Sequence, residues 1–298
     1  MKALIDADIL VYQYGFSAEK AYWKVEYTWE TETGDGKTDN TCFKTEEDAL
    51  RAQKKLLRYG CIKAITTCSS FPEDILENAK TMIRQQIDVI LELPFVDGCT
   101  LFLTGNDETN FRYAVATIKP YKGNRKGSRK PKMYHEIREH LITEYDTVVA
   151  NGIEADDALG SAQTETTFIC SIDKDLNMIP GWHYNFTSGK VYHISEEEGY
   201  RNFYTQMITG DTVDNVPGIK GMGKVKAAKA LAGVHTNFEM HRIVKKLYIK
   251  ANPDKTEEEV NKVITEIGTL LWIRRWEGAV EWHGFNYLPS KLEHTHDK

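Results

Sequence analysis

The sequence predicts an α/β fold in which helices flank a mostly parallel central sheet, followed by a helical C-terminal region. Short apolar runs of strand-forming residues end in acidic residues, and stretches with helical spacing separate them. From about residue 199 onward, apolar residues recur mainly at helical spacing. With 298 residues, the chain is long enough for one large or two smaller domains.

Composition and charge narrow the class of protein. Hydrophobic residues make up 41% of the chain and charged residues 28%, which is ordinary for a soluble globular protein. The five cysteines lack metal-ligand spacing, so we expect reduced thiols. No apolar run approaches membrane length, and Asp6 comes too early for a signal peptide. We therefore expect a cytoplasmic protein with no membrane partner.

The first predicted strand ends in acidic residues. Residues 2–8 have the pattern of a short buried strand, and a helix is expected to begin at Ile9. Asp6 then lies at the carboxyl end of the strand, where open α/β sheets carry their sites. We expect Asp8 to cap the helix rather than to bind a ligand.

Residues 20–68 are predicted to form an inserted substructure. Strand-like alternation over residues 22–44 surrounds a hairpin turn at Gly34-Asp35-Gly36. Thr45 and Asp48 form a capping box that opens a helix to about residue 59, and residues 61–67 predict another strand. The aromatic residues here could contact a partner, but packing within the hairpin is the preferred interpretation.

A helix, a strand and a basic segment follow. Residues 75–91 have helical spacing, and the buried strand over residues 99–104 precedes Asp107. Seven cations and no acid lie between residues 119 and 132: Lys119, Lys122, Arg125, Lys126, Arg129, Lys130 and Lys132. Such a patch attracts phosphates even on a chain with net charge −6. A solvated loop is the alternative, but the position directly after an acid-bearing strand favours nucleic-acid binding.

Two acidic stretches predict a metal site. Glu154, Asp156 and Asp157 lie at a strand-to-helix junction, and Asp173 and Asp175 end the next strand. Each stretch alone could be a turn or a helix cap. Together they place several carboxylates at one sheet edge, where their repulsion is tolerable only with cations between them. Oxygen ligands without a Cys/His cluster favour Mg²⁺ or Mn²⁺ over Zn²⁺.

A second acidic pair precedes a glycine turn. A helix over residues 196–209 should end at Gly210, and Asp211 and Asp214 have the spacing of side chains on one face of a helical turn. The glycines Gly218, Gly221 and Gly223 then open a helix whose basic residues are Lys224, Lys226 and Lys229. This turn offers backbone N–H groups to a phosphate, as in a helix-hairpin-helix motif. An ordinary helix-turn-helix corner is the alternative.

The remaining residues to the C-terminus predict further helices. Thr256 and Glu259 form a capping box ahead of an apolar helical pattern. Trp272, Arg274, Arg275 and Trp276 could stack on bases, although packing of the last helix is the preferred interpretation.

As a set, these motifs resemble the 5′ nuclease family of flap endonucleases and 5′-3′ exonucleases, most closely its free-standing bacteriophage members. The matching motifs are Ile5-Asp6-Ala7-Asp8, Asp107, Tyr121-Lys122-Gly123-Asn124-Arg125, Glu154-Ala155-Asp156-Asp157, Asp173-Lys174-Asp175, and Gly210-Asp211 to Asp214-Asn215 with the glycine turn. In this order, the motifs span nearly the whole chain. Residues 20–68 are longer than the same region of a minimal family member, and the residues flanking Asp107 differ from the usual pattern.

The resemblance implies a PIN/resolvase-like nuclease domain over residues 1–198, with a basic helical arch over residues 107–142, and a helix-three-turn-helix DNA-binding region over residues 199–298. The implied ligands of one metal ion are Asp6, Asp107, Glu154 and Asp156, and those of a second are Asp173, Asp175, Asp211 and Asp214. Asp157 would support them from behind.

The resemblance also implies roles for the cations. Lys122 and Arg125 would meet the scissile phosphate and act in catalysis together with Asp6, Asp156 and Asp173. Tyr121 could stack on a nucleotide. The implied DNA contacts also include Lys126, Arg129, Lys130, Gly218, Gly221, Gly223, Lys224 and Lys226. A K⁺ ion is a further expectation at the glycine turn.

The expected activity is hydrolysis of DNA at 5′ ends, flaps or nicks with two Mg²⁺ or Mn²⁺ ions, which can activate water and stabilise the leaving 3′ oxygen. RNA in RNA–DNA hybrids is a further expected substrate. A monomeric, phage-encoded protein acting in the host bacterial cytoplasm, in DNA replication or recombination, is what the resemblance suggests. The alternatives are a PIN-type ribonuclease and a non-catalytic DNA-junction binding module.

Overall fold

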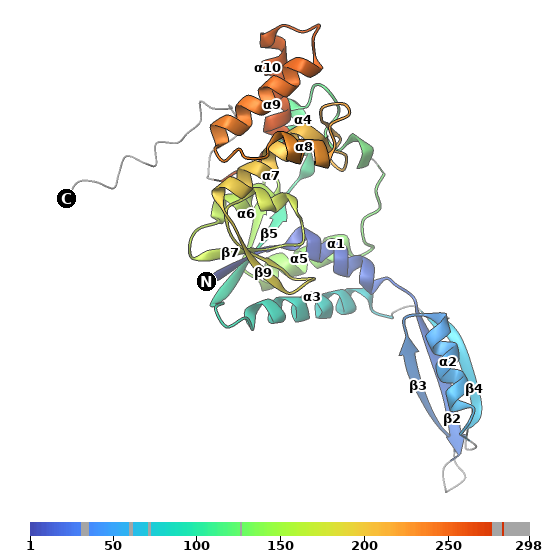
Figure 1. Cartoon of the computed structure of the whole chain (residues 1–298). Helices are drawn as coiled ribbons and strands as arrows, with labels where there is room; N and C mark the ends of the chain where they lie inside the picture. The colour runs from blue at the N-terminus through green and yellow to red at the C-terminus, as the bar shows by residue number, and fades with distance from the viewer. Residues whose placement is uncertain (31–35, 60–61, 71–72, 126, 276–281, 283–298) are drawn as a thin grey trace, which may run out of the picture. The chain divides into compact units, whose positions relative to one another are not determined.

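The computed structural model describes residues 1–30, 36–59, 62–70, 73–125, 127–275 and 282 (Figure 1). The chain divides into two compact units by its internal contacts. Unit 1 comprises residues 1–9, 87–129 and 141–298, and unit 2 comprises residues 10–86 and 130–140. None of the described helices has the length and apolar character needed to cross a bilayer.

Unit 1 is built on a six-stranded sheet with the order β6-β5-β1-β7-β8-β9. The strands are β1 (Lys2–Asp6), β5 (Gly98–Thr104), β6 (Thr147–Ala150), β7 (Thr167–Cys170), β8 (Gly181–Asn185) and β9 (Lys190–Ile194). Every neighbouring pair is parallel except β8 with β9. The predicted mostly parallel sheet is therefore confirmed. Because its inner strands are covered on both faces, they are continuous apolar runs: Ala3, Leu4 and Ile5 are all buried.

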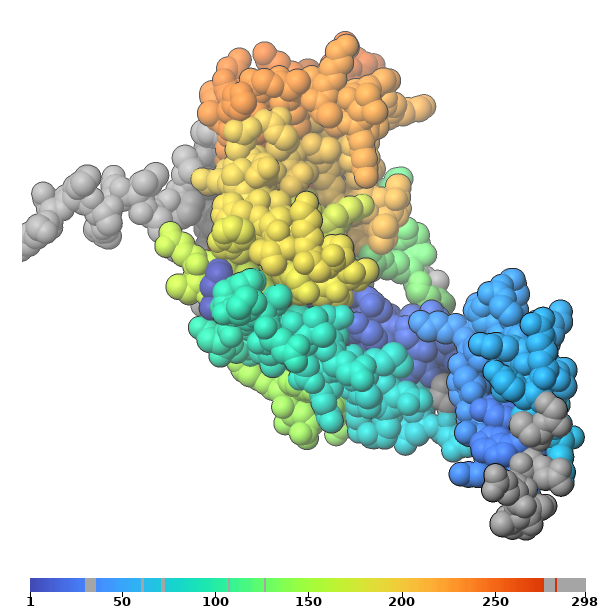
Figure 2. All heavy atoms as spheres, turned by 60° about the horizontal axis from the view of Figure 1, so that its bottom comes forward, coloured from blue at the N-terminus to red at the C-terminus, as the bar shows by residue number. Residues whose placement is uncertain are grey.

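The helices of unit 1 complete the α/β fold. They are α4 (Phe111–Val115), α6 (Ala155–Ala162), α7 (Glu196–Thr209), α8 (Lys224–Ala230), α9 (Asn237–Ala251) and α10 (Glu257–Leu271). Helix α6 packs against β1, β5 and β6, and α7 packs against α8, α9 and α10. One hydrophobic core runs from Leu4 and Ile169 in the sheet to Val260 and Ile264 in α10. Figure 2 shows α7 to α10, in yellow to orange, packed without a break.

Short elements connect the larger ones in unit 1. The 3-10 turns are η1 (Asp107–Thr109), η2 (Gly123–Arg125) and η3 (Asp175–Met178), and β10 (Gly210–Asp211) pairs with β11 (Val216–Pro217). Helices lie near the start and at the end of the predicted arch. The described basic residues between these helices include the 3-10 turn η2. Helix α5 (Tyr134–Glu144) begins three residues after Pro131.

Unit 2 contains most of α1 (Ala7–Ala18), α3 (Ile75–Leu91) and α5, and the whole predicted insertion. The insertion is a three-stranded antiparallel sheet of β2 (Tyr22–Glu30), β3 (Gly36–Phe43) and β4 (Ile62–Ser70), with β2 in the middle. Helix α2 (Glu46–Leu56) lies along one face of this sheet (Figure 1). Thr45 caps α2 as predicted, whereas Gly34 and Asp35 lie outside the described residues.

The predicted division into residues 1–198 and 199–298 stays a prediction, since both parts contribute to unit 1. Helix α1 begins at Ala7, two residues earlier than expected. Asp6 rather than Asp8 takes the capping position, because Asp6 Oδ1 accepts from Ile9 N at 3.3 Å. Asp8 sits in the first turn and accepts from Thr104 N at 2.9 Å, so its assignment as the cap was wrong.

Candidate active site

The predicted acids lie at the carboxyl ends of the parallel strands. Asp6 ends β1, Glu154 follows β6 and precedes α6, and Asp173 follows β7. Strands β6, β5, β1 and β7 are consecutive neighbours in the sheet, so their carboxyl ends meet at one edge. The sheet therefore brings together residues that are far apart in the sequence, as the alternation of strands and helices predicted.

Asp6, Asp156 and Asp173, called the Asp6 group below, repel one another electrostatically. Asp6 is 3% exposed, and its Oδ2 accepts from the Ser171 hydroxyl at 2.8 Å. Burial, together with repulsion from Asp8 and Asp173, raises the pKa of Asp6 to about 7. Burial and then the charges of Asp6 and Asp173 raise the pKa of Asp156 well above its ordinary value. This is the electrostatic situation that a bound cation would relieve.

Asp175 and Asp211 extend this group. Burial, and then repulsion from Asp173 and Asp211, raise the pKa of Asp175 to about 7. Asp211 Oδ2 accepts from the Gln206 amide at 2.9 Å. Asp175 is thus electrostatically linked to the Asp6 group through Asp173.

Asp211 and Asp214 do not share one face of a helical turn, and that expectation was wrong. They lie at the turn between β10 and β11, and Asp211 Oδ1 accepts from Val213 N at 2.7 Å. The side chain of Asp211 is therefore engaged within its own turn. Asp214 instead contacts the basic segment, as described next.

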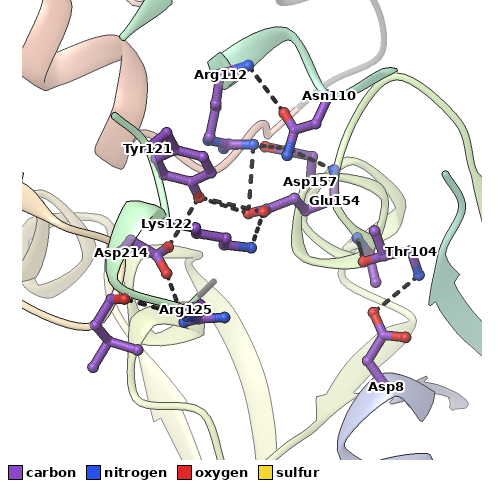
Figure 3. Close-up of polar contacts among 12 residues, drawn as sticks. Asp8, Thr104, Asn110, Arg112, Tyr121, Lys122, Arg125, Glu154, Asp157 and Asp214 are labelled. Carbon is purple, nitrogen blue, oxygen red and sulfur yellow. Dashed lines mark hydrogen bonds and ion pairs between the residues drawn. The ribbon is translucent and has the colours of Figure 1, made fainter. Parts of the chain in front are cut away.

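Glu154 and Asp214 are paired with the cations that the sequence assigned to phosphate binding (Figure 3). Lys122 Nζ forms an ion pair with Glu154 Oε1, and Arg125 Nη2 contacts Asp214 Oδ1 at 2.6 Å. Burial acts to raise the pKa of Glu154, but Arg112 and Lys122 outweigh it and lower the pKa. Burial dominates at Asp214 and raises its pKa despite Lys122 and Arg125. The basic segment therefore contacts the acidic site directly.

Tyr121 lies between these two acids. Its hydroxyl donates to Asp214 Oδ2 at 2.9 Å and lies 3.1 Å from Glu154 Oε2. The side chain is only 4% exposed and packs edge-on against Tyr113. In this conformation Tyr121 positions Glu154 and Asp214, and its predicted stacking on a nucleotide would require the ring to move.

A buried ion pair supports the site from behind. The guanidinium of Arg112 forms a bidentate pair with Asp157 at 2.6 and 2.9 Å, and both side chains are almost completely buried. Asp157 Oδ2 also accepts from Glu154 N at 3.2 Å, and its role in supporting metal ligands stays a prediction. Arg112 further donates to the carbonyls of Leu270 and Trp272. The pair therefore ties the end of α10 to the start of α6.

No role was predicted for Arg112. Its sequence signal is weak, because a lone arginine ahead of a basic segment resembles the cations that follow it. The adjacent Phe111, over which the guanidinium lies at 4.8 Å, is the one local hint that this arginine points inward.

Several predicted DNA contacts can be placed. Gly218 lies so close to Thr209 and Gly210 that an added Cβ would meet backbone atoms at 2.2 and 2.3 Å, and Gly221 has φ +77°. The turn therefore needs glycine at both positions. Gly223 precedes the first residue of α8, Lys224, and Lys226 Nζ donates to Gly221 O at 2.8 Å.

The structure describes only some of the other side chains that were predicted to contact DNA. Arg129 and Lys130 are exposed, and Lys130 lies over the Tyr134 ring at 4.3 Å. Lys126, Trp276 and the side chain of Asp107 lie outside what the structure describes. Trp272 is 8% exposed and packs against Phe203, which supports packing over base stacking for this residue.

The donor chemistry of the site suits a hard divalent cation. Its side chains offer carboxyl oxygens, and burial and mutual repulsion raise the pKa of Asp6 and Asp156, a cost of ionisation that a bound cation would offset. Among the described residues, no three Asp, Glu, His or Cys side chains gather closely enough to hold one ion as they stand. The pairing of Glu154 and Asp214 with Lys122 and Arg125 is one reason, because it directs two candidate ligands toward protein cations.

Comparisons with known proteins agree with the motifs. No protein-family model matches the chain. An exodeoxyribonuclease of Enterobacteria phage T3 is 31% identical over 136 residues, which cover 42% of this chain and 45% of that protein. A 5′-3′ exonuclease of Buchnera aphidicola subsp. Baizongia pistaciae is 25% identical over 187 residues, which cover 53% and 59%. The chain thus spans about half the length of the curated relatives it matches.

A solved structure of the T5 5′-exonuclease with bound zinc ions aligns at 16% identity with a TM-score of 0.49, and the alignment covers 63% of this chain and 80% of that one.

Proposed function

We propose that this chain, whose resemblance to 5′ nucleases is confirmed by two curated relatives, is a divalent-metal-dependent 5′ nuclease acting on DNA. Its reaction would be hydrolysis of phosphodiesters at 5′ ends, flaps or nicks, as a 5′-3′ exonuclease and flap endonuclease. The observation that carries the proposal is the contact of Lys122 and Arg125 with Glu154 and Asp214 beside the Asp6 group. A phosphodiester needs cations and carboxylates at one place, and this site offers both.

The residues proposed to hold the metal ions are Asp6, Asp107, Glu154 and Asp156 for one ion and Asp173, Asp175, Asp211 and Asp214 for the other. When bound, two such ions would lower the pKa of the attacking water and stabilise the charge on the leaving 3′ oxygen. Mg²⁺ is the proposed ion, with Mn²⁺ as its substitute.

The protein's own side chains would bind and orient the phosphate. Lys122 and Arg125 would leave Glu154 and Asp214 for the non-bridging oxygens of the scissile phosphate, where they stabilise charge in the transition state. Ser171 holds Asp6 in one orientation through its 2.8 Å hydrogen bond, and Asp157 holds the backbone of Glu154. Releasing the two acids from their cations would make them available as ligands, so substrate and metal binding would favour each other.

The surrounding elements would supply binding to the rest of the substrate. The glycine turn before α8 would contact a backbone phosphate, and a K⁺ ion would occupy the same turn. Arg129 and Lys130 would add attraction to the phosphate backbone. Activity on RNA in RNA–DNA hybrids, a monomeric state and a role in phage DNA replication or recombination complete the proposal.

Cleavage assays test this function. With Mg²⁺, the chain should release short products from 5′-flap, nicked or blunt DNA, and Asp173→Asn or Asp156→Asn should abolish cleavage while DNA binding changes by no more than a few fold. Asp254→Asn, which alters an exposed acid in the loop before α10, is the matched control and should retain activity. Undiminished turnover in either site variant would overturn the proposal.

The same assays separate the rival functions. A PIN-type ribonuclease would cleave single-stranded RNA in preference to a flap duplex. A DNA-junction binding module would bind the flap without cleaving it at any metal concentration. The proposed function requires cleavage of the flap duplex and excludes both patterns.

A further inference from the structure

The inserted sheet of unit 2 carries a cationic surface that the proposed site does not use. Between Asp48 and Glu73 the sequence has five cations and no acid: Arg51, Lys54, Lys55, Arg58 and Lys63. The first three lie on α2, and Arg58 lies in the turn that follows it. The cations are therefore concentrated in the second half of α2 and the turn after it, whereas the acids Glu46, Glu47 and Asp48 occupy the first turn of the helix.

The packing of α2 turns these cations away from the sheet. Ala49 is fully buried, and Gln53 accepts a hydrogen bond from the Thr67 hydroxyl of β4 at 3.0 Å. Positions 51, 54, 55 and 58 follow the i, i+3, i+4, i+7 pattern on the opposite side, and all four side chains are exposed. They form a stripe about 10 Å long at the helical rise per residue.

In the described part of the chain, three of the four stripe residues form no ion pair with an acid. Arg51 pairs with Glu47 at 3.0 Å. No carboxylate among the described residues forms an ion pair with Lys54, Lys55 or Arg58. Lys54 and Lys55 lie in the last turn of α2, where cations also stabilise the helix dipole, but that effect does not require Arg58 or a groove beside them.

A groove of about 560 Å³ runs along this stripe. Its walls include the four cations of the stripe and one acid, Asp48, with Phe43 and Ala52 as apolar lining. Tyr59, immediately beyond Arg58, is 54% exposed. Proteins commonly bind nucleic-acid strands with a groove of cations that follows the phosphate backbone and with aromatic side chains beside it.

We propose that α2 and the turn after it bind the phosphate backbone of the DNA substrate, with Lys54, Lys55 and Arg58 as the contacting residues. The inference rests on the proposed function for the choice of DNA as the polyanion. Phosphates of one strand follow each other at about 3.4 Å along a duplex axis, so a stripe of about 10 Å matches about three of them. The insertion would thereby add a DNA contact of its own.

Salt-dependent binding tests the inference without requiring cleavage. Affinity for a 5′-flap duplex is measured by fluorescence anisotropy in EDTA at several KCl concentrations, for wild type and for Lys54→Gln/Lys55→Gln/Arg58→Gln. The slope of log affinity against log salt should decrease in magnitude by about 2 to 3, because each lost phosphate contact removes about 0.9. Affinity at about 0.1 M salt should fall at least tenfold, and kcat at saturating DNA should stay unchanged.

A second variant removes the same charge elsewhere. Lys37→Gln/Arg84→Gln/Lys190→Gln changes three exposed cations outside the stripe and should leave the slope as in wild type. An unchanged slope in the stripe variant, or an equal loss in both variants, would overturn the inference. If the wild type binds DNA with the expected slope but cleaves none in Mg²⁺, the proposed function fails while this inference stands.

Discussion

The buried pair of Arg112 and Asp157 allows a quantitative test of how the site is held. Replacing Arg112 by Met leaves the Asp157 carboxylate buried without its cation. Replacing Asp157 by Asn removes the bidentate partner of the buried guanidinium and leaves it only Glu154 Oε2, at 3.7 Å, as an anion among the described residues. Removing one partner of a buried pair costs about 3–5 kcal/mol of unfolding free energy. Arg112 also donates to the carbonyls of Leu270 and Trp272, and each of these hydrogen bonds is worth about 1 kcal/mol. Because Arg112→Met removes both, its cost should lie at the upper end of the 3–5 kcal/mol range, which is about 5 kcal/mol.

The double variant, with Arg112→Met and Asp157→Asn, should cost clearly less than the sum of the single variants, because it leaves no buried charge unpaired. We expect a coupling energy of at least about 2 kcal/mol, measured by urea unfolding followed by circular dichroism. The exposed pair Arg51–Glu47 provides the matched reference and should contribute less than about 1 kcal/mol. Single-variant costs below about 1 kcal/mol, or strict additivity, would refute the reasoning.

Three further predictions concern chemistry, packing and pH. Lys122→Ala should slow single-turnover cleavage at least tenfold while DNA affinity changes less, and an effect on affinity alone would contradict its assigned role. Gly218→Ala should destabilise the chain by more than about 1 kcal/mol in urea unfolding, since its Cβ would meet Thr209 C at 2.2 Å, and a neutral result would show that the turn can shift. Burial lowers the pKa of His183 below the ordinary 6.5, so the unfolded chain binds more protons as pH falls below about 6.5 and stability decreases there. His183→Gln should reduce that decrease between pH 7 and pH 5, and parallel pH profiles of the two proteins would contradict it.

Local signals predicted the regular elements well. Helix α7 begins and ends where the sequence indicated, because Ser195 and Glu198 form a capping box and Gly210 adopts φ +73° at its end. The strands that end in Asp6 and ahead of Asp173 were also found, since buried parallel strands are short apolar runs. The convergence of these acids follows from topology alone, because neighbouring parallel strands share one carboxyl edge.

Non-local partners were beyond the reach of the sequence pattern. Arg112 pairs with an acid 45 positions away and with carbonyls of Leu270 and Trp272, and no spacing rule connects such residues. The pairing of Lys122 with Glu154 was likewise unforeseen, because both had been assigned to other partners. Asp8 and Asp211 were misplaced for a local reason: short acidic side chains can bond to several nearby backbone N–H groups, and the sequence does not say which.

The ends of the insertion are neighbours in space. Tyr22, where its first strand begins, pairs directly with Ser70, where its last strand ends. Antiparallel partners have Cα atoms about 5 Å apart, a gap that a two-residue link can bridge. Replacing the whole segment by a short link would therefore leave the path of the chain on either side unchanged.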